Sequence, residues 1–145
     1  MSEQEARSAA FDGDWTRLWF SLVGPWASLA VVPTDAGVDP TPSADGLASV
    51  GRRSGTRPVR VVNACAVRLE DVERVVQSVN AMTDAGDLVL VTVDSLAGNP
   101  AALPIIRATS GALLVARIPD SYLSSARHTV QAIGKNRIVG SVLLG

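Results

Sequence analysis

The chain has 145 residues, which suits one domain and is too short for two of ordinary size. Its 13 basic and 14 acidic side chains nearly cancel, and this balance argues against a nucleic-acid-binding protein, which needs clustered basic charge. One cysteine excludes a disulfide framework and a multi-cysteine zinc site, and one histidine argues against a histidine-built metal centre or a Ser-His-Asp triad. We therefore expect neither a metal ion nor nucleic acid as a partner.

The polar start of the chain predicts a flexible segment over residues 1–11, without the apolar run of a signal peptide. Residues 12–145 are expected to form a single α/β domain. No apolar run reaches the roughly 18 residues that a membrane span needs. We therefore expect a cytoplasmic protein with no membrane span.

Residues 15–23 are expected to form a helix, after which short apolar runs alternate with stretches of helical periodicity. The runs are rich in β-branched residues and lack strict polar alternation, which is typical of parallel strands buried on both faces. The five predicted strands are Ser28–Val32, Val59–Val62, Asp87–Val93, Ala112–Ile118 and Ile138–Leu144.

The intervening stretches predict helices over Ala44–Arg53, Leu69–Met82, Ala101–Thr109 and from Ser121 or Ser124 to Ile133. Asn99 is the expected N-cap of the third, with Pro100 in its first turn. The two prolines within Val38–Ser43 predict a loop. This order of elements predicts a doubly wound α/β fold: a mostly parallel, five-stranded sheet with helices on both faces.

In such a fold, ligands bind at the carboxyl ends of the strands, so the loop after the first strand is informative. This loop runs from Pro33 to Ser43 and reads PTDAGVDPTPS. A phosphate-binding loop needs glycines, so that its backbone can wrap the phosphates, and then Lys and Ser or Thr at the start of a helix. The loop has the position and the length for this role but not the residues.

Two segments, Asn99–Arg117 and Ile138–Leu144, resemble the later helix and the last two strands of the cytoplasmic kinase domain of the bacterial tyrosine kinases of polysaccharide export. This family is a branch of the MinD/ParA-like P-loop ATPases. The resemblance implies a P-loop NTPase-like fold, shortened between Cys65 and Asp87.

The family's phosphate-binding loop is altered here. Gly37 matches its first glycine, and Thr41 keeps a hydroxyl at the Mg²⁺-ligand position. Asp39 stands where a glycine belongs, and Pro40 stands where the phosphate-gripping lysine belongs. Pro40 supplies neither an ammonium group nor a backbone N–H, and Asp39 brings a negative charge towards the phosphate position.

The family's two acidic motifs are altered as well. Asn63 and Cys65 stand at the Asp-x-Asp positions, and Thr92 stands at the Walker B aspartate, with Asp94 two residues further on. Phosphoryl transfer depends on positioning and on charge neutralisation by Lys and Mg²⁺. We therefore expect a pseudo-ATPase or pseudokinase without enzymatic activity and without a cofactor.

The resemblance implies a binding or regulatory subunit in bacterial exopolysaccharide synthesis or export. Its partner would be a membrane polysaccharide synthase or co-polymerase, or a second copy of the chain, and the partner would hold it at the inner membrane. The candidate partner-binding residues combine an aromatic cluster with a basic pair: Trp15, Trp19, Phe20, Trp26, Arg52 and Arg53. An alternative role for the tryptophans is to pack onto the sheet of their own domain as a lid. The arginines have an alternative interpretation as solvent-exposed residues at the end of a helix.

Two other functions stay open at this point. One is a non-catalytic cell-polarity or division regulator of the MinD/ParA type. The other is a small enzyme that uses polar residues at neighbouring strand ends, which are Asp35, Asp39, Asn63 and Asp94. The enzyme hypothesis requires a pocket in which these four side chains converge.

Overall fold

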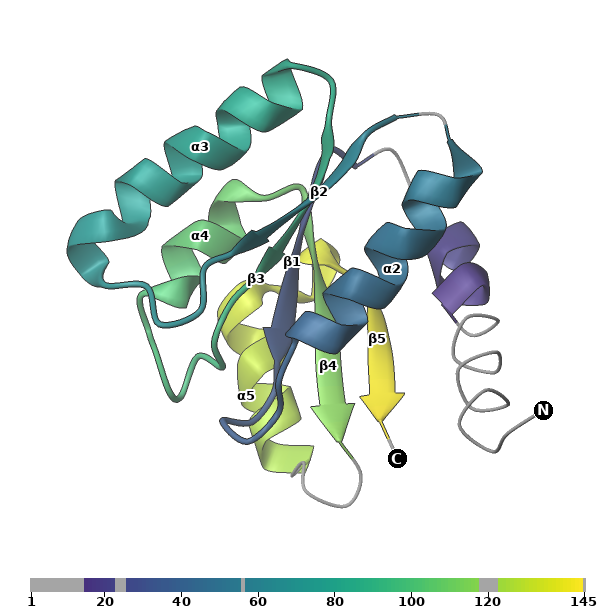
Figure 1. Cartoon of the computed structure of the whole chain (residues 1–145). Helices are drawn as coiled ribbons and strands as arrows, with labels where there is room; N and C mark the ends of the chain where they lie inside the picture. Colours follow the sequence, from purple (N-terminus) through teal and green to yellow (C-terminus); the bar gives the residue numbers. More distant parts are fainter. Residues whose placement is uncertain (1–14, 23–25, 56, 118–122, 145) are drawn as a thin grey trace.

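The computed structural model describes residues 15–22, 26–55, 57–117 and 123–144, so the flexible segment predicted over residues 1–11 lies outside it. Five parallel strands form one sheet in the order β2-β3-β1-β4-β5 (Figure 1). This topology confirms the predicted doubly wound α/β fold. The strands are β1 (Ser28–Pro33), β2 (Val59–Asn63), β3 (Leu88–Thr92), β4 (Gly111–Arg117) and β5 (Ile138–Leu144).

Helices cover both faces of the sheet (Figure 1). One face carries α3 (Val72–Asp84), which follows a short 3-10 turn (Leu69–Asp71), together with α4 (Ala102–Ala108) and α5 (Leu123–Ile133). The other face carries α2 (Thr41–Ser54) and the helical residues 15–21.

Side chains of β1 alternate between two hydrophobic cores because successive residues of a strand point to opposite faces. Ala30 and Val32 pack into the core beneath α3, α4 and α5, whereas Leu29 and Val31 pack into the core beneath α2. All four side chains are fully buried. Burial on both faces explains why the strand reads as a continuous apolar run.

The helix after β1 begins earlier than predicted. The sequence predicts a loop over Val38–Ser43 and a helix from Ala44, but Thr41 to Ser43 form the first turn of α2. The Asp39 carboxylate accepts the N–H of Thr41 at 2.9 Å and supports the helix start. Pro42 is tolerated because the first-turn N–H groups have no partner within the helix.

Two further helix starts differ in detail from the prediction. The N-cap of α4 is Ala101 rather than Asn99, so Pro100 precedes the helix. The Asn99 side chain still acts at this end, because its Oδ1 accepts the N–H of Ala101 at 3.2 Å. The predicted helix over Leu69–Met82 is divided into the 3-10 turn and α3.

Candidate functional site

The topology creates a crevice between the carboxyl ends of β1 and β3. These strands are neighbours in the sheet, but the chain continues from β1 into α2 on one face and from β3 into α4 on the other (Figure 1). The two loops therefore diverge, and an open α/β sheet offers its ligand site at such a point.

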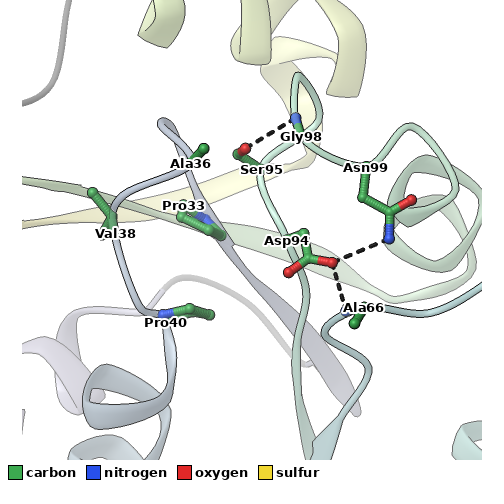
Figure 2. A pocket seen from close by; sticks show the side chains of 9 residues that line it. All are labelled: Pro33, Ala36, Val38, Pro40, Ala66, Asp94, Ser95, Gly98 and Asn99. Atoms are coloured by element: carbon green, nitrogen blue, oxygen red, sulfur yellow. Dashed lines mark hydrogen bonds between the residues drawn. The ribbon is translucent and has the colours of Figure 1, made fainter.

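A cavity of about 360 Å³ occupies this crevice (Figure 2). Its lining comes from the loops after β1, β2 and β3. The lining residues are Pro33, Ala36, Val38, Pro40, Ala66, Asp94, Ser95, Gly98 and Asn99.

Asp94 organises one wall of the cavity. Its Oδ2 accepts the backbone N–H of Ala66 at 2.6 Å and a side-chain N–H of Asn99 at 3.1 Å (Figure 2). The same Asn99 amide also donates to the carbonyl of Val67 at 2.9 Å. Asp94 and Asn99 together tie the loop after β2 to the loop after β3.

The single thiol lies beside this wall. Burial, the largest cause, raises the pKa of Cys65, and the negative charges of Asp94 and Asp39 raise it further. A hydrogen bond with Thr92 acts in the opposite direction. The net shift keeps the thiol protonated, so the site does not activate Cys65 as a nucleophile.

The start of α2 offers few donors to an anion. Pro40 and Pro42 have no N–H, and the N–H of Thr41 is already bonded to Asp39. Gly37 has neither a positive φ nor a close neighbour that would require glycine, unlike a glycine that lets a loop wrap a phosphate. Among the described residues that line the cavity there is no lysine or arginine, and the one charged residue is Asp94.

The four residues of the enzyme hypothesis do not share this cavity. Of Asp35, Asp39, Asn63 and Asp94, only Asp94 lines it. Asp35 accepts the hydroxyl of Thr34 at 3.2 Å, and Asn63 Oδ1 accepts the N–H of Cys65 at 2.9 Å. These polar groups support their own turns.

Ala66 and Ser95 line the cavity, although the sequence did not predict them as site residues. Neither residue type carries a recognisable signal, because Ala66 contributes its backbone N–H and Ser95 a buried hydroxyl. The sequence predicts Asn99 as a helix cap. Its position at the start of the helix that follows β3 was the available clue to its place in the site.

The aromatic cluster packs partly against the domain itself. A Cβ placed at Gly46 would overlap the ring of Trp15, and one at Gly51 would overlap the ring of Trp19. Helix 15–21 therefore lies against two glycines of α2. Trp19 also meets Trp26 edge-on, with ring centroids 5.4 Å apart.

Phe20 faces away from this packing, with 71% of its surface exposed. It is thus the member of the cluster that is most available to a partner.

The arginines near the end of α2 are partly committed to the fold. Arg52 and Arg53 are both exposed, and Arg52 Nε donates to the carbonyl of Val59 at 3.1 Å. Arg60 forms an ion pair with the largely buried Asp87 at 2.6 Å. The predicted pair therefore lies at the surface, with Arg52 also bonded to the start of β2.

Within the described ranges, no three or more His, Cys, Asp or Glu side chains gather where they would hold a metal ion. The helices in those ranges are all too short or too polar to cross a membrane.

No protein-family model and no curated protein matches the chain. Among solved structures, it is similar to the kinase domain of the Escherichia coli tyrosine kinase ETK, with a TM-score of 0.74 and 18% sequence identity. The similarity covers 94% of this chain and 74% of that one. The chain therefore shares the P-loop-like α/β fold of a bacterial tyrosine kinase domain.

Proposed function

We propose that the chain is a catalytically inactive P-loop-like protein, a pseudo-ATPase or pseudokinase. We further propose that it acts as a binding or regulatory subunit in bacterial exopolysaccharide synthesis or export. One observation carries the proposal of inactivity: the carboxylate of Asp39 occupies the N–H of Thr41 at the start of α2. In an active P-loop protein, a phosphate takes the N–H groups at this position.

The charges around the cavity support the same reading. A nucleoside triphosphate with Mg²⁺ needs donors and cations, but the described part of the lining offers one carboxylate and otherwise uncharged residues. Asp39 lies on the adjoining loop and adds a second negative charge near the position of the phosphates. The residues present do not fit the nucleotide that this fold usually holds.

The subunit role rests on the resemblance to the polysaccharide-export kinases and on the surface of the domain. The partner we propose is a membrane polysaccharide synthase or co-polymerase, or a second copy of the chain. Phe20, Arg52 and Arg53 are the exposed residues of the predicted interface, while Trp15 and Trp19 pack against α2. Such a partner would hold the domain peripherally at the inner membrane.

Calorimetric titration with ATP and ADP, each with Mg²⁺ and up to millimolar concentration, tests the inactive site. We expect no binding heat and no rise in the melting temperature. Turnover of ATP by the chain would overturn the proposal. Binding at micromolar affinity without turnover would show that the loop after β1 still holds nucleotide and would make the chain a nucleotide-gated switch; the bound nucleotide would then raise the melting temperature.

Co-purification with the candidate synthase or co-polymerase tests the subunit role. We expect the wild-type chain to be retained and the Phe20→Asp variant to be lost from the complex. Equal retention of both chains would contradict the assignment of this surface. Retention of neither would contradict the role itself.

A further inference from the structure

The cavity between β1 and β3 has two walls of different chemistry. Pro33, Ala36, Val38 and Pro40 form an apolar wall, and Asp94 lies across from it with Ser95 (Figure 2). One oxygen of Asp94 binds Ala66 and Asn99, and the other oxygen points away from these two donors (Figure 2).

The charge of Asp94 is not balanced by a cation. Among the described residues, its hydrogen-bond donors are the backbone N–H of Ala66 and the side-chain amide of Asn99, and both are neutral. Within the described part of the chain, the ion pairs lie elsewhere, at Arg60 with Asp87 and around Asp71. A half-buried carboxylate in this setting favours a positive partner.

We propose that this cavity binds an organic cation, an ammonium or guanidinium group carried on an apolar stem. The cationic group would bind the carboxylate of Asp94, and the stem would lie along Pro33, Val38 and Pro40. This inference rests on the proposed function, because a nucleotide in the crevice would exclude it. The proposed ligand is a cation, whereas active relatives with this fold bind an anionic nucleotide in the crevice.

The chemistry of the two walls supports this ligand class. An ionised donor on a carboxylate makes a hydrogen bond about twice as strong as one between neutral groups. A methylene stem gains by leaving water for the apolar wall, as the stems of Lys and Arg do at protein surfaces. The volume lies at the small end of the range for ligand pockets, which suits a side chain or a small amine.

NMR titration of the full chain with four matched probes tests the inference. The probes are butylammonium, butylguanidinium, neutral butanol and butyrate. We expect the two cations to shift the amide signals of Ala66, Ser95 and Gly98, with butanol binding at least about tenfold more weakly and butyrate not at all. Equal binding of butanol and butylammonium would overturn the inference, as would binding of butyrate.

Three variants assign the binding to the cavity. Asp94→Asn keeps an acceptor for Ala66 and Asn99 but removes the charge, so the Kd for butylguanidinium should rise at least about tenfold. Ala36→Leu narrows the cavity and should weaken binding although Asp94 is intact. Asp84→Asn makes the same charge change at the far end of α3 and should leave the Kd unchanged. Unchanged binding in both cavity variants would contradict the inference.

Two further arms identify the source of the cation and separate the two proposals. A hexapeptide with a central arginine is compared with the same peptide carrying citrulline. Tighter binding of the arginine peptide than of butylguanidinium indicates that the ligand is a protein segment, and equal binding of these two probes indicates a small amine. A citrulline peptide that binds as well as the arginine peptide overturns the inference. A chain that hydrolyses ATP refutes the proposed function, whereas one that neither hydrolyses ATP nor binds the cations refutes this inference alone.

Discussion

The carboxylate of Asp94 accepts the N–H of Ala66 at 2.6 Å, and Ala66 is the described non-glycine residue with a positive φ, of 59°. A left-handed backbone costs an L-residue roughly 1–2 kcal/mol. The residue with the strained backbone is thus the one whose N–H Asp94 accepts. Asp94 therefore stabilises the conformation of the loop after β2 beside the cavity.

Replacement of Ala66 by glycine should stabilise the domain. Glycine accepts the left-handed conformation without strain, so we expect the free energy of unfolding to rise by up to about 1 kcal/mol in urea denaturation. Ala97→Gly, in an exposed turn without positive φ, is the matched control and should lower it slightly. A loss of stability at Ala66 equal to that at Ala97 would contradict the reported strain.

Methyl groups at the two glycines beneath the tryptophans should displace helix 15–21. Gly46→Ala and Gly51→Ala would overlap the rings of Trp15 and Trp19, and overpacking of this kind costs roughly 1–3 kcal/mol. We also expect the tryptophan fluorescence to shift to longer wavelength as the rings become exposed. Gly37→Ala has open space at its Cβ and should change neither measurement; the prediction fails if all three variants behave alike.

Loss of the acceptor at the start of α2 should destabilise the domain. Asp39→Ala removes the group that accepts the N–H of Thr41, and the loss of such an acceptor costs roughly 0.5–2 kcal/mol. Asp45→Ala, exposed further along the same helix, removes an equal charge and should be neutral or slightly stabilising in the same urea experiment. If the two variants were equally stable, the hydrogen bond from the Thr41 N–H to Asp39 would contribute nothing to the stability of the domain.

The Cys65 thiol should react slowly with iodoacetamide. Because its pKa is raised, the reactive thiolate is scarcer at pH 8 than in the denatured chain, and the inflection of rate against pH should lie higher in the folded protein. Asp94→Asn removes one of the charges that raise the pKa, so the inflection should move down and the rate at pH 8 should increase. Asp84→Asn serves as the distant control, and an inflection that Asp94→Asn leaves in place would show that the charge of Asp94 does not contribute to the shift.

The strands could be predicted from the sequence within one or two residues at most ends. Their interior residues, such as Val31 and Leu90, are buried on both faces, and this forces uninterrupted aliphatic runs that local reading detects. Helix starts were harder to predict. The beginning of α2 depends on a hydrogen bond from the N–H of Thr41 to the side chain of Asp39. Two prolines follow Asp39 within three residues, and local rules assign such a segment to a loop.

The sequence alone determined the alternation of strands and helices, the presence of Asp94 near a strand end and a loop after β1 that contains no lysine. These features are local, because each is set by residue type and by spacing along the chain. The tertiary structure alone decided which side chains meet. Ala66 and Asn99 reach Asp94 because β2 pairs with β3 and places the two loops side by side, and Trp15 and Trp19 lie against α2 because glycines leave room for their rings. Contacts between residues so distant in sequence depend on the order of the strands and on the packing of the layers, and neither leaves a periodic signal in the chain.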